Sequence, residues 1–262
     1  LDETRIIIIN NSPEDNLSLT KWTNNPKITI FNTGMNVGYA TGLNRGIRYA
    51  LRDIDLKYVI ITNNDVIVPK SLIEDVENHA WEKNILAPIV VYQGTDIVQN
   101  TGGRISYLIG GTYNLNKNVP KDKIKIKEVD FLSGCMMVIS KEIIEDVGLF
   151  DPDYLAYYED VDYCLRAKAK GYGLKICEDI EIQHAHSTST MNKFGFKHYL
   201  IAKNSIIFAK KNLVFPKKQI FIMMSILRGF FQNINYLSSY FQGVLEGLKF
   251  KNKLPKLFNI NQ

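Results

Sequence analysis

Three carboxylates within four residues, Glu159, Asp160 and Asp162, are the densest group of potentially reactive side chains in this chain. Acids are favoured in the first turn of a helix, where free N–H groups and the helix dipole stabilise negative charge, so one or two of them need no function. Asp162 and Arg166 stand four residues apart, which allows them to pair along a helix. The pattern predicts one structural acid and one acid free for chemistry.

Polar clusters follow two short apolar runs. Asn10 and Asn11 end a β-branched run, and Asn63, Asn64 and Asp65 end another apolar run. In open parallel sheets, ligands bind beyond the carboxyl ends of the strands. Amides there suit a base or a ribose, and a carboxylate suits Mg²⁺ or Mn²⁺, which often bridge substrate phosphates. The alternative for the second cluster is a turn with Asx hydrogen bonds.

Residues 36–46 carry glycines and asparagines just ahead of and into a predicted helix, with Asn36, Gly38, Asn44 and Arg45 among them. Glycine allows a tight backbone, and a helix N-terminus is a common anion site. The spacing does not match a Walker loop.

Two histidines, His184 and His186, follow the last predicted strand. A lone histidine at such a place is more often an ordinary core or surface residue. Near an acid cluster, an imidazole could instead complete a divalent metal site that an aspartate begins.

Short apolar segments alternate with helical segments of 10–15 residues over the first part of the chain, which favours parallel βαβ units. We expect Ser140 to cap a short helix that ends near Gly148. Residues 93–128 are less regular and predict hairpins and a loop, and residues 217–248 predict a helix.

A chain of 262 residues is long enough for one large α/β domain with an appendage. Cys135, Cys164 and Cys177 are odd in number and form no CxxC pair, so we expect free thiols in a reducing, cytoplasmic compartment.

The C-terminal part is basic and apolar: residues 193–262 hold 12 Lys or Arg and a single acid, Glu246. The apolar segment 219–231 is shorter than the ~20 residues that span a bilayer. It fits an interfacial helix on an anionic membrane surface. It fits equally a helix packed on the body or on a second subunit of a homodimer, because periodicity does not separate these cases. Few aromatic residues lie on a basic face, which argues against a nucleic-acid partner.

Four segments, in this order and spacing, resemble the family 2 glycosyltransferases, particularly the bacterial and archaeal branch that includes rhamnosyltransferases. Residues 9–12 resemble the family's V-D-N-x-S, and 36–46 resemble N-x-G-F followed by N-x-G. Residues 63–65 resemble its D-x-D metal motif, and 159–166 resemble E-D-x-D-(x)3-R. Lys203-Asn204 stands where relatives often carry R-N, and the match covers about residues 4–212.

The resemblance implies an α/β fold: a GT-A-like, mostly parallel sheet flanked by helices over residues 1–192, with a helical tail over 193–262. It implies a metal-dependent, inverting hexosyltransferase (EC 2.4). Such an enzyme moves a sugar, for this branch rhamnose, from a nucleotide-diphospho-sugar to a hydroxyl of a glycan or lipid-linked acceptor in polysaccharide or cell-surface glycan synthesis. We expect it in the cytoplasm or peripheral on the cytoplasmic membrane face.

The resemblance also implies roles for single residues. Asp65 and His184 would hold Mg²⁺ or Mn²⁺, with His186 as the alternative to His184. Asp160 would be the general base, and Glu159 would orient it or contact the acceptor. The expected nucleotide-side residues are Asn10, Asn11, Asn36, Gly38, Asn44, Arg45, Asn63 and Asn64, and the expected substrate contacts are Gly134, Cys135 and Asp162.

Two departures from the family pattern affect these expectations. Asn10 replaces the usual Asp, so it can accept a hydrogen bond from a base but carries no charge. Relatives usually begin with another strand, so we expect this chain to lack the first family strand and to show an exposed sheet edge. The alternative functions are a sugar-nucleotidyltransferase and a non-catalytic scaffold that binds nucleotide or glycan.

Overall fold

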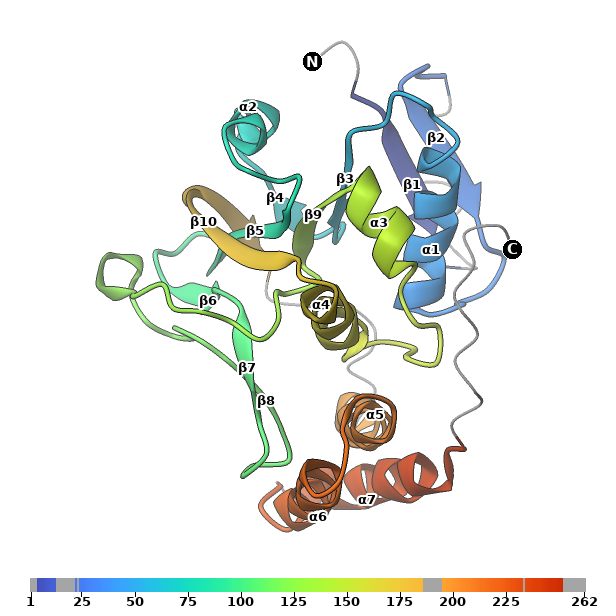
Figure 1. Cartoon of the computed structure of the whole chain (residues 1–262), viewed down its shortest axis with the longest axis vertical. Coiled ribbons are helices and arrows are strands. Elements are labelled where there is room, and N and C mark those ends of the chain that lie inside the picture. The colour runs from blue at the N-terminus through green and yellow to red at the C-terminus, as the bar shows by residue number, and fades with distance from the viewer. Residues whose placement is uncertain (1–3, 13–21, 23, 186–194, 233, 252–262) are drawn as a thin grey trace.

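The computed structural model describes residues 4–12, 22, 24–185, 195–232 and 234–251. Figure 1 shows a central sheet with β1, β2 and α1 to one side and the helices α5, α6 and α7 gathered at one end of the molecule. The α/β class predicted from the alternation of short strands and helices is confirmed.

A six-stranded sheet lies at the centre, with the order β3-β9-β5-β10-β4 and with β6 paired to β5. Strand β5 is buried almost throughout because the sheet continues on both of its sides. The strands are β3 (Tyr58–Thr62), β4 (Val66–Ile67), β5 (Asn84–Tyr92), β6 (Val98–Asn100), β9 (Met136–Ser140) and β10 (Gly173–His184).

The strand directions correct one detail of the prediction, because the sheet is mixed rather than mostly parallel. Strand β9 runs antiparallel to both β3 and β5, while β5 and β10 are parallel. Strands β3, β5 and β10 therefore share one direction, and their carboxyl ends meet the amino end of β9 at one rim of the sheet. Hydrophobic patterns report burial and not direction, which explains why the sequence did not reveal the reversed strand.

Strands β1 (Ile6–Asn10) and β2 (Ile28–Asn32) form a separate parallel pair. Among the described residues, β1 pairs only with β2, and β3 pairs only with β9. Each of these strands therefore has one side without a paired strand within the described residues, and the lack of a further family strand stays a prediction.

The first turns of α1 and α4 lie at the rim where β3, β5 and β10 end, and both contact Gly134 there, whereas α3 begins at the opposite rim, where β9 ends. The cap of α3 follows the sequence prediction, since Ser140 Oγ accepts a hydrogen bond from Ile143 N at 3.1 Å. A β-hairpin and a short 3-10 turn occupy the region that the sequence left irregular. The bounds are α1 (Tyr39–Ala50), α2 (Leu72–Glu77), α3 (Lys141–Val147), α4 (Glu159–Ala169), β7 (Gly103–Ser106), β8 (Gly111–Asn114) and η2 (Lys121–Lys123).

The tail forms three helices: α5 (Phe196–Asn212), α6 (Lys217–Gly229) and α7 (Ile234–Lys249). Phe208 of α5 and Phe221 of α6 belong to the same hydrophobic core as Phe150 of the body. The division at residue 192 therefore stays a prediction, since the core crosses it. Within the described residues, none of the helices combines the length and apolar character needed to cross a bilayer.

Candidate active site

The predicted reactive residues converge at the rim where β3, β5 and β10 end. Asp65 lies just after β3, and His184 is the last residue of β10. The segment before β9 joins this corner to α4: Cys135 O accepts from Asn63 N at 3.0 Å, and Gly134 N donates to Asp160 Oδ2 at 3.0 Å. Residues more than a hundred positions apart therefore form one site.

His184 links Asp65 to Gln99 of β6. Its Nε2 lies 3.0 Å from Asp65 Oδ1, and its Nδ1 lies 2.7 Å from Gln99 Oε1. A proton on Nδ1, donated to Gln99, leaves the Nε2 lone pair facing the carboxylate. Two facing lone pairs at this distance call for a proton or a cation between them.

The donor set of Asp65 and His184 fits a divalent ion. Oxygen and nitrogen ligands at about 2.1 Å from one octahedral ion lie about 3 Å apart when they are neighbours. No third His, Cys, Asp or Glu joins them in the part of the chain that the structure describes. Water and substrate phosphate oxygens would therefore complete the shell, as is usual for Mg²⁺ in phosphate chemistry. His186, the alternative ligand, lies outside the described residues.

Asp160 is held by backbone donors at the start of α4. Val161 N donates to its Oδ1 at 2.8 Å and Gly134 N to its Oδ2 at 3.0 Å. Tyr39 fixes the same loop, because its hydroxyl donates to Gly134 O at 2.6 Å. Burial raises the pKa of Asp160, and the backbone hydrogen bonds oppose this rise. Two backbone N–H groups thus fix the position of the carboxylate, which is the arrangement that a general base needs.

Glu159 meets a different environment. It is only 6% exposed, and its Oε2 has no hydrogen-bond partner among the described residues. Burial, followed by the charge of Asp160, raises the pKa of Glu159 well above its ordinary value. We infer that Glu159 keeps its proton, which leaves Asp160 as the ionised member of the pair.

A strained turn precedes these acids. Tyr157 and Tyr158 both have left-handed backbone angles, with φ of 67° and 76°. Such angles are costly for bulky residues and persist only where the surroundings enforce them. Asn204 of α5 enforces them here: its Nδ2 donates to Ala156 O at 2.8 Å and to Tyr157 O at 2.9 Å. Asn204, the asparagine of the R-N resemblance, therefore supports the turn that precedes Glu159 and Asp160.

The loop before α1 is organised from the end of β1. Asn11 accepts from Val37 N at 2.9 Å and donates to Asn36 Oδ1 and Gly38 O, both at 3.2 Å. Asn10 donates at 2.9 Å to an asparagine at the end of β2. Nucleotide contacts by Asn10, Asn11 and Asn36 stay predictions, and the amides already bind within the protein.

The structure reassigns two of the predicted nucleotide residues. Gly38 has φ of 85°, and a Cβ there would lie 2.6 Å from Leu155 Cδ1, so its glycine is explained by packing on the loop before α4. Asn44 is 4% exposed, and its side-chain amide binds the backbone of Phe150. Its Oδ1 accepts a hydrogen bond from Phe150 N at 2.9 Å, and its Nδ2 donates one to Phe150 O at 2.7 Å. Neither side of that amide is left for a nucleotide.

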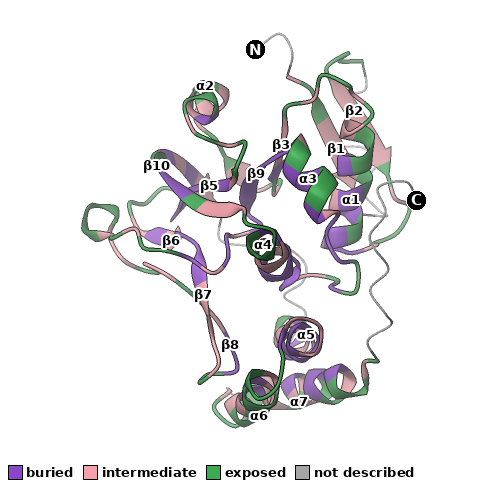
Figure 2. Cartoon of the chain, viewed as in Figure 1, coloured by how far each residue is buried: buried purple, intermediate pink, exposed green. Residues whose placement is uncertain are grey.

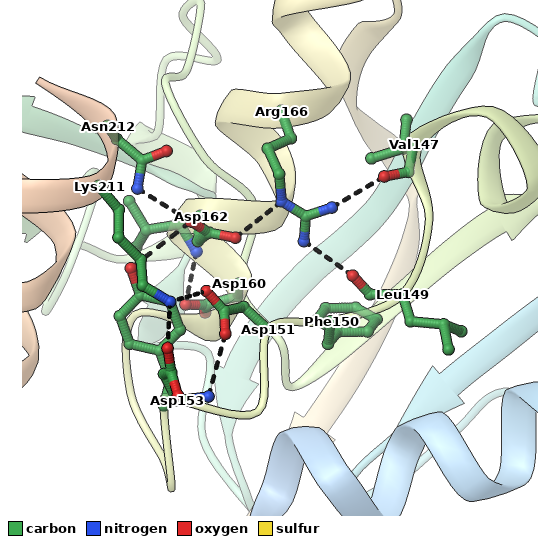
Figure 3. A network of polar contacts seen from close by, with 12 residues as sticks. Val147, Leu149, Phe150, Asp151, Asp153, Asp160, Asp162, Arg166, Lys211 and Asn212 are labelled. Carbon is green, nitrogen blue, oxygen red and sulfur yellow. Dashed lines mark hydrogen bonds and ion pairs between the residues drawn. The ribbon is translucent and has the colours of Figure 1, made fainter. Parts of the chain in front are cut away.

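Asp162 is also corrected, from a substrate contact to a structural acid. It is 3% exposed, and it accepts from Arg166 Nε at 2.8 Å and from Asn212 Nδ2 at 2.9 Å. Figure 3 shows the arginine continuing to the carbonyls of residues 147 and 149, at 3.0 and 2.9 Å. Lys211 of α5 binds two further acids in the loop before α4. The i,i+4 pair predicted from sequence is present, and it anchors α4 to α5.

The other predicted residues line the rim less directly. Asn63 is half-buried beside Asp65, while Asn64 and Arg45 are exposed. Cys135 is buried, and burial followed by the charge of Asp65 raises the pKa of its thiol to about 12, so it is neutral. Gly134 is buried between Asp160 and Tyr39, each about 3.5 Å from where a Cβ would lie. Their substrate contacts stay predictions.

Gln99, Tyr39 and Asn204 were missing from the predicted site. Each acts through a partner at least 47 residues away in the chain, so no local pattern could reveal Gln99. Tyr39 and Asn204 lie in segments that match the family, but the resemblance assigned no role to either residue.

The fold is a GT-A-like α/β fold, and at one rim of its sheet it holds the Asp65–His184 pair and the backbone-bound carboxylate of Asp160. The model of the family described as Glycosyl transferase family 2 matches residues 1–148, and the chain belongs to that family. It is a glycosyltransferase rather than a nucleotidyltransferase.

Two sequence relatives are similar over most of the chain. The low-salt glycan biosynthesis hexosyltransferase Agl10 of Haloferax volcanii is 24% identical over 263 residues, which cover 95% of this chain and 84% of the relative. The dTDP-rhamnosyl transferase RfbF of Shigella flexneri is 26% identical over 204 residues, 71% of this chain. The match spans 64% of that relative, less than two thirds of its length.

A solved structure supports the fold. The mannosyltransferase PcManGT of Pyrobaculum calidifontis, in complex with GDP-Man and Mn²⁺, aligns with a TM-score of 0.53 at 14% identity. The alignment covers 96% of this chain and 68% of that one.

Proposed function

We propose that this enzyme transfers a hexosyl group from a nucleotide-diphospho-sugar to a hydroxyl of a glycan or lipid-linked acceptor, with inversion at the anomeric carbon. The observation that carries the proposal is the meeting of two chemical functions at one rim: the Asp65–His184 pair and the backbone-fixed Asp160. Direct inversion needs a base for the acceptor and charge stabilisation for the leaving diphosphate, and these residues fit both.

The relatives support the substrate class. The solved mannosyltransferase holds GDP-Man and Mn²⁺, which supports a sugar nucleotide and a divalent ion for this chain. The rhamnosyl relative is named for a dTDP-sugar, so rhamnose is the first sugar to test. The hexosyltransferase relative is named for glycan biosynthesis, which supports a glycan or its lipid-linked precursor as acceptor. The three buried free thiols support the reducing, cytoplasmic location.

At the reaction centre, Asp160 would take the proton of the attacking hydroxyl while Tyr39 and Gly134 hold its carboxylate in place. Asp65 and His184 would hold Mg²⁺ or Mn²⁺, which supplies Lewis-acid stabilisation of the diphosphate. Glu159, kept neutral, would be able to donate a hydrogen bond to the acceptor.

A donor screen tests this function. The full chain is mixed with dTDP-rhamnose, GDP-mannose and UDP-hexoses, with Mn²⁺ or with EDTA, and the melting temperature and the release of nucleoside diphosphate are followed. We expect one donor class to raise the melting temperature only with metal, since a ligand at 100 times its Kd stabilises by about 2.7 kcal/mol. NMR of the transferred sugar should show the anomer opposite to the donor's. Binding without hydrolysis or transfer for every donor would instead support a non-catalytic scaffold, and a retained anomer would refute inversion.

A further inference from the structure

The outer side of α6 and the residues after it carry several exposed apolar side chains. Ile220, Met223 and Leu227 recur at helical spacing and are exposed, while Phe221 and Ser225 on the other side of α6 are fully buried. The row continues past the helix end into residues that are up to 88% exposed. We call this set the α6 face: Ile220, Met223, Leu227, Phe230, Phe231 and Ile234.

Figure 2 shows exposed stretches of α6 and α7 at the end of the molecule away from α2. The tip of the β7–β8 hairpin reaches the same end in Figure 1. Leu108, in that tip, is exposed. A Cβ on Gly110 in that tip would lie 2.0 Å from the backbone nitrogen of Ser225, so hairpin and helix are in close contact. Exposed apolar surface gathered in this way marks an interaction site.

The charges around the α6 face are basic. Lys217 and Lys218 open α6, and Lys249 and Lys251 lie at and beyond the end of α7. The single acid between residues 195 and 251 is Glu246, and it already binds a tyrosine and a lysine of α5. A second copy of this chain would bring the same positive charge against it, whereas an anionic surface would be attracted.

We propose that the α6 face docks on an anionic lipid bilayer, with α6 lying along the surface. The Phe, Leu, Ile and Met side chains would enter the boundary between head groups and acyl chains, and the flanking lysines would meet lipid phosphates. Since no described helix is long and apolar enough to cross the bilayer, this contact is peripheral.

Docking there would bring the turn at Tyr157 and Tyr158, which precedes Glu159 and Asp160, toward the membrane. The buried side of α6 contacts the core beneath that turn: the ring of Phe208 lies 6.0 Å from Phe221 of α6 and 5.6 Å from Tyr158. Tyr158 directly precedes Glu159 and Asp160. Resting on the proposed transferase function, this arrangement favours an acceptor carried by a lipid over a free soluble glycan.

Vesicle sedimentation with the full chain tests the docking itself. Vesicles of phosphatidylcholine alone and of phosphatidylcholine with 30% phosphatidylglycerol are spun with the protein at about 0.1 and 0.5 M NaCl. We expect binding to the anionic vesicles that weakens at the higher salt. The paired change Phe230→Ser and Phe231→Ser should lower the partition coefficient at least tenfold, and Lys217→Gln with Lys218→Gln should remove most of the salt dependence.

Matched controls change the same residue types elsewhere. Met35→Ser with Ile54→Ser replaces two exposed apolar residues outside the α6 face, and Lys70→Gln with Lys123→Gln removes two exposed charges. Both control pairs should bind as the unaltered protein does. Circular dichroism confirms that each variant is folded.

The proposal would be overturned if the protein did not bind anionic vesicles, or if the control pairs lost as much vesicle binding as the variants of the α6 face. A dimer in light scattering that the Phe230→Ser, Phe231→Ser pair dissociates, without vesicle binding, would make the α6 face a self-interface instead. Donor hydrolysis without lipid should be unchanged in the phenylalanine pair, so failure of docking and failure of the proposed function give different results.

Discussion

Two neighbouring carboxylates in α4, Glu159 and Asp160, are both raised in pKa by burial but differ in their hydrogen bonds. Glu159 is buried with an oxygen that lacks a partner in the described structure, and its pKa is raised well above the ordinary value. Asp160 is held by two backbone N–H groups that favour its charged form. Separating the protonation states of adjacent acids is how a site obtains one donor and one acceptor of protons at the same pH.

Asp160→Asn tests the assignment of the base. The amide keeps the size of the side chain but cannot take the acceptor's proton, so we expect kcat to fall by about 10²–10⁴-fold. The Kd of the donor should stay within about twofold, since Asp160 lies on the acceptor side of the proposed reaction. Turnover within a few-fold of the original would assign the base elsewhere.

The pH dependence follows from the raised pKa of Asp160. The base works only when ionised, so kcat/KM should fall as the pH drops through a pKa above that of an ordinary aspartate. In Glu159→Gln the acid limb should stay in place, because the neutral amide resembles the protonated carboxyl. If the limb moves to lower pH in this variant, Glu159 carries a charge in the original enzyme.

At the scale of elements, α5 supports the turn that presents these acids. Asn204→Ala removes two hydrogen bonds that the Asn204 amide donates to the turn in which Tyr157 and Tyr158 have left-handed backbone angles. Leaving buried carbonyls without donors costs about 1–3 kcal/mol, so we expect a lower free energy of unfolding in urea together with a lower kcat. Asn78→Ala, an exposed change at the end of α2, is the control and should alter neither. An unchanged kcat in a destabilised Asn204→Ala protein would limit that residue to stability.

Local patterns predicted the elements well where the cause was local. The Ser140 cap, the acidic first turn of α4 and the Asp162–Arg166 pair all depend on residues within four positions. The hydrogen bonds between Asn44 and Phe150 join residues 106 positions apart. The sequence alone therefore could not separate a structural role of Asn44 from nucleotide binding. The predicted helix over 217–248 is two helices, α6 and α7, because helical composition alone does not place a break.

At the scale of the whole molecule, the sheet brings distant segments to one rim. The rule that ligands meet the carboxyl ends of parallel strands placed Asp65 and His184 correctly, although β9 runs the other way between β3 and β5. Strand β6, which follows β5, supplies Gln99, and Gln99 contacts His184 although no sequence feature marked it. The family resemblance singled out Asp65, His184 and Asp160, which the fold brings to one rim, and the packing shows that Asn44 and Asp162 support the structure.

We propose that two separate functions, metal-assisted donor binding and proton removal, share this rim of the sheet. Calorimetric titration of the matching nucleoside diphosphate, with and without Mn²⁺, tests it on three proteins: the original chain, Asp65→Ala and Asp160→Asn. We predict Mn²⁺-dependent binding in the original and in Asp160→Asn, and loss of the Mn²⁺ dependence in Asp65→Ala. Equal Mn²⁺-dependent binding by Asp65→Ala, or its loss in Asp160→Asn, would contradict the account.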